Sequence, residues 1–142
     1  MAQQTPSQSQ IAALMQQGFA LHQQGQFTQA KQMYEQVLAK QPQHFDALHL
    51  SGVIAFQSNA PALAVELIDR AIKVNPNDAG AYSNRGLALQ ELKRMAEAVV
   101  SYDRAIALKP DYALAYWNKS LLKILTGDYL EGWQLYEWRW KK

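Results

Sequence analysis

The stretch that decides the fold is residues 76–110, PNDAGAYSNRGLALQELKRMAEAVVSYDRAIALKP, which begins and ends on proline. These prolines belong to a longer series in which residues of one kind recur every 34 positions. The series contains Pro42, Pro76 and Pro110; Gly18, Gly52 and Gly86; and Ala30, Ala64 and Ala98. Because several residue types keep one phase, the chain is built from repeats.

Each repeat is expected to hold two helices. In the stretch 76–110, Tyr82, Gly86 and Leu89 fall on one helical face, and Ala98 and Tyr102 begin a second face of the same spacing. A 34-residue period of this kind is typical of stacked helix-turn-helix units. We therefore expect an all-α, right-handed solenoid of about four repeats and eight helices. The repeats are expected at residues 11–44, 45–78, 79–112 and, incompletely, 113–142.

The residues that keep the period also predict how the helices end and cross. Pro42, Pro76 and Pro110 each follow a helix that cannot continue through them. Asn77, Asp78 and Asp111 are expected to cap the helices that come next. The glycines at positions 18, 52 and 86 are expected to face the alanines at 30, 64 and 98, so that two backbones cross closely.

The pattern resembles the tetratricopeptide repeat family from Ile11 onward. Asn59 and Lys93 stand where Gly25 and Gly127 mark the turn between helices, a departure that loosens single turns. A narrower resemblance, in residues 46–55 and 127–140, is to bacterial proteins in which such repeats precede a domain related to O-linked N-acetylglucosamine transferase. That resemblance implies that the chain is the N-terminal part of a longer protein.

Composition sets further bounds. The hydrophobic share of 49% is enough for a core. The net charge is +2, and the 14 basic residues are scattered along the chain, so neither nucleic acid nor an anionic membrane is the expected partner. The absence of cysteine favours the cytoplasm. Residues 1–10 carry no apolar run and are expected to form a flexible polar leader before a single domain at 11–142.

Function is expected on the concave surface lined by the first helix of each repeat. Its inward side chains mix aromatic, aliphatic and amide groups, which suits an extended peptide of a protein partner. The predicted peptide-binding residues are Met15, Phe19, His22, His49, Val53, Phe56, Ser83, Asn84, Leu87, Gln90, Trp117, Asn118 and Leu121. None is Lys or Arg, so a site for acidic chaperone tails is not expected.

Asn84 and Asn118 are one period apart and could hydrogen-bond to a peptide backbone. The resemblance to O-linked N-acetylglucosamine transferase implies such an asparagine ladder, although Gln16 and Leu50 occupy the place in the first two repeats. The alternative is that both asparagines are neutral, solvated helix residues.

Catalysis is not predicted for this chain. No phosphate loop, nucleophile elbow or dense carboxylate cluster is present. Asp46 and His49 could share an ion, but two ligands are too few for a catalytic zinc site. No metal or cofactor is expected, and an enzymatic role would belong to a longer protein, a glycosyltransferase whose repeats recognise its substrate.

The last residues predict an exposed aromatic surface on the final helix. Trp133, Tyr136 and Trp140 are spaced along one face of the final predicted helix. Tyr136 matches Tyr34 and Tyr102 in the repeat and could pack within its own unit, whereas the tryptophans fall where neighbouring repeats meet. We expect this surface to dock a following domain or to self-associate as a homo-oligomer.

Overall fold

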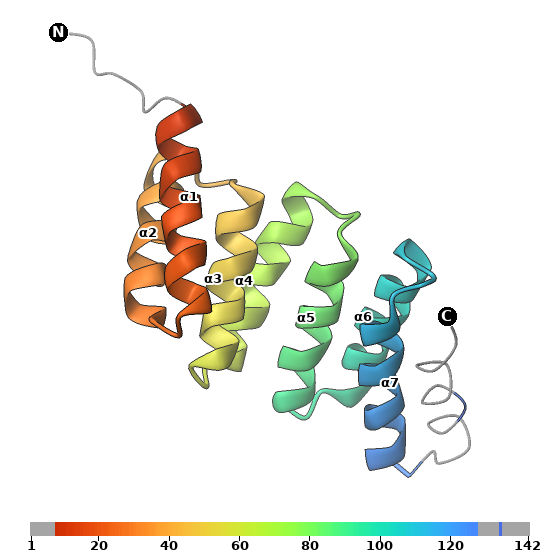
Figure 1. Cartoon of the computed structure of the whole chain (residues 1–142). Helices are drawn as coiled ribbons and strands as arrows, with labels where there is room; N and C mark the ends of the chain where they lie inside the picture. The colour runs from red at the N-terminus through yellow and green to blue at the C-terminus, as the bar shows by residue number, and fades with distance from the viewer. Residues whose placement is uncertain (1–7, 128–133, 135–142) are drawn as a thin grey trace, which may run out of the picture. The chain divides into compact units, whose positions relative to one another are not determined.

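The computed structural model describes residues 8–127 and residue 134, and every regular element in them is an α-helix (Figure 1). The helices are α1 (Gln8–Gln23), α2 (Phe27–Lys40), α3 (Phe45–Gln57), α4 (Pro61–Val74), α5 (Ala79–Glu91), α6 (Met95–Leu108) and α7 (Ala113–Leu125). The all-α repeat fold is therefore confirmed. The expected eighth helix, with Trp133, Tyr136 and Trp140, lies outside the described residues.

The chain divides into two compact units, each built from helical hairpins. Unit 1 (Met1–Val74) holds α1 to α4, in which α1 packs on α2, α3 packs on α4, and α2 also contacts α3. Unit 2 (Asn75–Lys142) holds α5 to α7, in which α5 contacts both α6 and α7. Helix α1 begins at Gln8, within the segment that we expected to be a polar leader.

The turns between paired helices fall where the sequence places them. Gly25 and Gly127 have positive φ angles of 77° and 90°. Asn59 and Lys93, at the equivalent positions, have the same left-handed conformation with φ 63°. The period thus fixes a backbone conformation that only two of the four residues adopt without steric cost.

Prolines and caps set the helix ends. Pro42, Pro76 and Pro110 each stand two residues beyond the last residue of α2, α4 or α6. Asp78 caps α5, with its Oδ1 accepting from the backbone N–H of Ala81 at 2.8 Å.

The expected cap at Asp111 was wrong, because α7 begins after Tyr112 and has no side-chain cap. His44 stands one period before Asp78 and two before Tyr112. It caps α3 through Nδ1, which accepts from the N–H of Ala47 at 3.1 Å.

Close packing within each hairpin depends on the glycines, whose nearest neighbours are large side chains that the period does not predict. At Gly52 the expected alanine is also a neighbour, since a Cβ there would lie 3.3 Å from the carbonyl oxygen of Ala64. A Cβ built on Gly18 would lie 2.7 Å from Cε1 of Tyr34, and one on Gly86 would lie 2.7 Å from Cδ1 of Tyr102. Gly52 meets Ile68 in the same way, at 2.6 Å from Cγ1. Each glycine therefore accommodates a large buried side chain of the partner helix.

The periodic alanines complete this packing. Ala30, Ala64 and Ala98 are fully buried in the hairpin interiors. No helix in the part of the chain that the structure describes is long and apolar enough to cross a membrane.

Candidate functional site

The predicted peptide-binding residues are called the stripe from here on. In unit 1 they lie on α1 and α3, and their side chains are only partly covered. Phe19 is 46% exposed, whereas His22, His49, Val53 and Phe56 are half-buried. Met15 is also half-buried and packs against the core cluster around Ile11 and Tyr34. The stripe thus offers apolar surface that this unit does not use fully in its own core.

His22 ties the two first helices of unit 1 together. Its Nε2 lies 2.7 Å from Oε1 of Gln57, which joins the C-terminal ends of α1 and α3. The imidazole also meets Phe27 and Tyr34 edge to face, with ring centroids 5.6 and 6.3 Å apart. These contacts fix the His22 ring at one end of the stripe.

In unit 2 the stripe lies on α5 and α7, and two of its residues are bonded to each other. Nδ2 of Asn118 donates to Oγ of Ser83 at 3.3 Å, and both side chains are buried. Tyr112 also hydrogen-bonds Ser83. Burial raises the pKa of Tyr112, and the charge of Asp78 raises it further against the lowering effect of the Ser83 bond.

The Asn118–Ser83 bond changes what the asparagine pair can do. One N–H of Asn118 is used to join α7 to α5, so its amide is oriented by the fold before any peptide arrives. Asn84 is half-buried and has interactions of its own. The two asparagines, although equivalent in sequence, therefore differ in burial.

The remaining residues of the unit 2 stripe are more accessible. Leu121 is 37% exposed, and Leu87, Gln90 and Trp117 are half-buried. Gln90 accepts from the Tyr102 hydroxyl at 3.0 Å, which links the stripe to α6. This surface has apolar patches flanked by amide groups that are already held in place.

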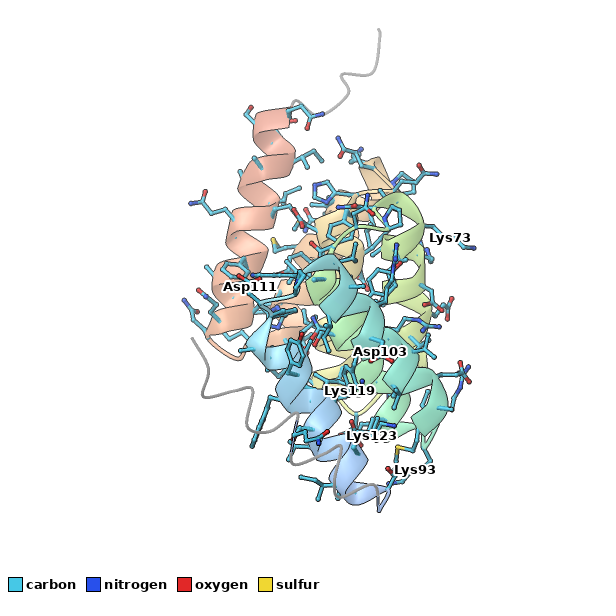
Figure 2. The ribbon with its side chains drawn as sticks, turned by 90° about the vertical axis from the view of Figure 1, so that its right-hand side faces the viewer. Lys73, Lys93, Asp103, Asp111, Lys119 and Lys123 are labelled. Carbon is cyan, nitrogen blue, oxygen red and sulfur yellow. The ribbon has the colours of Figure 1, made fainter. Side chains whose placement is uncertain are left out.

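The long cations of α5 and α7 both reach α6. Nη1 of Arg85 donates to Oγ of Ser101 on α6 at 2.8 Å. Nζ of Lys119 lies 2.8 Å from Oδ1 of Asp103 on α6, and Figure 2 labels both residues of this pair. These two contacts were not predicted, although the two cations occupy one position of the repeat.

The described residues hold no group of three or more His, Cys, Asp or Glu side chains that could bind a metal ion. Asp46 and His49 lie on α3 as the sequence indicates, without a third such ligand among the described residues.

Solved structures share this fold. MamA from Desulfovibrio magneticus RS-1 is 22% identical, with a TM-score of 0.82 over 89% of this chain and 72% of that one. The first repeat domain of Spaghetti (RPAP3), bound to the HSP90 peptide SRMEEVD, is 21% identical with a TM-score of 0.80 over 86% of this chain and 97% of its own.

A third similar structure is the O-GlcNAc transferase of Thermobaculum terrenum, in a K341M mutant. It is 23% identical with a TM-score of 0.89, and the match covers 97% of this chain but 27% of the transferase. No curated protein sequence matches this chain.

Sequence models of one family match most of the described helices. Two models, both described as tetratricopeptide repeat, match residues 21–84 and residues 79–112. Together with the period of 34 residues and the seven described helices, they show that this chain belongs to the tetratricopeptide repeat family.

Proposed function

We propose that this chain is a protein-interaction module that binds extended peptide segments along the first helices of its repeats. The observation that carries the proposal is the incompletely covered first-helix stripe, in which Phe19 and Leu121 stay exposed beside half-buried aromatic and amide side chains. The Spaghetti domain, which has this fold, holds a peptide. Tetratricopeptide repeats are interaction modules, and the cysteine-free composition favours action in the cytoplasm.

The two units offer different chemistry to a peptide. Phe19, Val53 and Phe56 in unit 1 supply apolar shelves for alternate side chains. Asn84 and Gln90 in unit 2 supply amides, which pair with both N–H and C=O groups of an extended backbone. Because no predicted contact residue is Lys or Arg, we propose peptides with apolar anchors rather than acidic tails.

The test starts from peptides of twelve residues selected by display against the purified chain. Binding is then measured by fluorescence anisotropy for Phe19→Ala, Phe56→Ala and Asn84→Ala. We expect these three residues to be among the minority of contact residues whose truncation costs about 1 kcal/mol or more, so each change should weaken binding about fivefold or more.

The matched control is Val100→Ala, an exposed apolar residue on α6. It is expected to leave binding unchanged. Asn118→Ala also removes the hydrogen bond that joins α7 to α5. A thermal melt of that variant is therefore needed to separate a loss of binding from a loss of stability. Selected peptides that tolerate all three stripe variants would show that binding lies elsewhere.

The second candidate is a substrate-recognition part of a larger glycosyltransferase. The observation that favours it is the match of nearly the whole chain to about a quarter of the Thermobaculum terrenum enzyme. Reading the source gene beyond the codon for Lys142 tests it. A following α/β domain supports the transferase, and an immediate stop codon contradicts it.

A further inference from the structure

Unit 1 also has a groove whose lining residues are not part of the stripe. It is formed by α2, α3 and α4 and has a volume of about 310 Å³. Its lining residues are Lys31, Glu35, Leu38, Ser51, Ile54, Ala55, Ser58, Ala60, Leu63 and Leu67. Most of these are aliphatic, and Leu63 is 41% exposed.

The groove is open at the position where the two first helices of unit 2 carry a long cation, and where α1 carries Gln17. Ser51, Arg85 and Lys119 hold one position of the repeat, on α3, α5 and α7. Both cations reach α6: Arg85 reaches forward to Ser101 within its own hairpin, and Lys119 reaches back to Asp103 on the second helix of the preceding repeat. Serine is too short to do this, so Ser51 leaves the space unfilled.

The chain itself shows what fits such a place. The Lys119 side chain is only 14% exposed, with its ammonium 2.8 Å from Asp103. An alkyl stem therefore covers apolar surface while its charged end meets a carboxylate. In unit 1 the residue equivalent to Asp103 is Glu35, and it lines the groove.

Two features leave the unit 1 groove able to accept such a group. Among the described residues, the cation paired with Glu35 is Lys31 on its own helix, at 3.8 Å, with both side chains more than half exposed. A pair of that kind is weak and readily exchanged. At the groove wall, Ser51 is 8% exposed, and its Oγ has no hydrogen-bond partner among the described residues.

We propose that this groove receives a lysine or arginine side chain of a protein partner. The stem lies against Ile54, Leu63 and Leu67, and the cationic end meets Glu35 in place of Lys31. The partner thus supplies in trans the contact that Lys119 makes within unit 2. This site is separate from the peptide stripe and extends the interaction surface to the second helices.

The test uses two short probes, acetyl-Ala-Ala-Lys-Ala-Ala-amide and the same peptide with norleucine in place of lysine. Binding to the full chain is followed by NMR of the methyl groups of Leu38, Ile54 and Leu63. The lysine peptide is expected to shift these resonances and to bind about fivefold or more tighter than the norleucine peptide, because only it pairs with Glu35. Equal binding of the two probes would overturn the proposal.

Three variants locate the site. Ser51→Lys supplies the side chain from within and is expected to abolish the shifts, whereas Val100→Ala, on α6 and outside the groove lining, is expected to bind as the wild type does. Glu35→Gln is expected to bind the lysine and norleucine peptides with about equal affinity. A circular-dichroism melt establishes that Ser51→Lys is folded, and Glu35→Gln decides the matter if it is not. Wild-type lysine preference in Glu35→Gln contradicts the assignment.

Discussion

At the scale of single residues, the turn position shared by Gly25, Asn59, Lys93 and Gly127 shows how the fold tolerates an unsuited side chain. All four adopt positive φ, which costs an L-residue with a Cβ about 1–2 kcal/mol. Glycine avoids that cost but loses about 0.5–1 kcal/mol of chain entropy on folding. Lys93→Gly is therefore expected to raise the free energy of unfolding by about 0.5–1 kcal/mol, measured by urea denaturation.

Asn59→Gly is the matched control for this prediction. Asparagine tolerates the left-handed region better than lysine because its short polar side chain bonds locally. The gain at Asn59 should therefore be smaller than the gain at Lys93. A larger gain at Asn59 would mean that the strain at Lys93 is relieved by other contacts.

At the scale of the helical hairpin, stability depends on small residues that let large ones pack. Ala98 is fully buried on α6, near the place where Tyr102 covers Gly86. Ala98→Leu is expected to overpack this crossing and lower the free energy of unfolding by about 1–3 kcal/mol. Val100→Leu on the same helix is the control, since Val100 is 66% exposed. If thermal melts show the same midpoint for both variants, the packing assigned to Ala98 is wrong.

The sequence predicted these hairpins well but not the atoms that meet in them. Helix ends followed from Pro42, Pro76 and Pro110 because a proline beyond the first turn removes a backbone hydrogen bond and clashes with the turn before it. The expected contact of Gly52 with Ala64 is present, but the large side chain at each glycine was missed. Spacing places Gly86 and Ala98 on facing helices but does not say that the Tyr102 ring fills the gap. Similarly, Tyr112 rather than Asp111 occupies the N-cap position of α7, and its side chain makes no capping hydrogen bond.

At the scale of the whole chain, the period separates residues that maintain the scaffold from residues that are free to vary. The placement of the stripe residues on the first helices could be predicted, because the helical period alone assigns a face, and their role in binding a peptide stays a prediction. The bond between Asn118 and Ser83 could not, since it depends on the distance between α5 and α7. The groove at Ser51 was also missed. The sequence did indicate it, because a short serine stands at the repeat position that Arg85 and Lys119 occupy in unit 2.

The same scaffold makes the chain sensitive to alkali in both units. Burial raises the pKa of Tyr34 in unit 1 to about 12, from an ordinary value of 10.0. Burial also raises the pKa of Tyr102 and Tyr112 in unit 2. A folded pKa above the unfolded value means that the folded state holds the phenolic proton more tightly. The stabilisation is therefore complete below pH 10 and is lost as the pH approaches the folded pKa.

Tyr34→Phe isolates one part of this effect, because the phenyl ring keeps the packing on Gly18 and has no proton to lose. The hydroxyl of Tyr34 has no hydrogen-bond partner among the described residues, so the substitution should cost little at pH 8. Between pH 9 and pH 11.5 the wild type should lose at most about 2 kcal/mol more stability than Tyr34→Phe. Lysine deprotonation affects both proteins equally and cancels in the comparison. Urea denaturation at the two pH values measures the difference, and parallel losses in wild type and variant would show that Tyr34 ionises in the folded state as easily as in water.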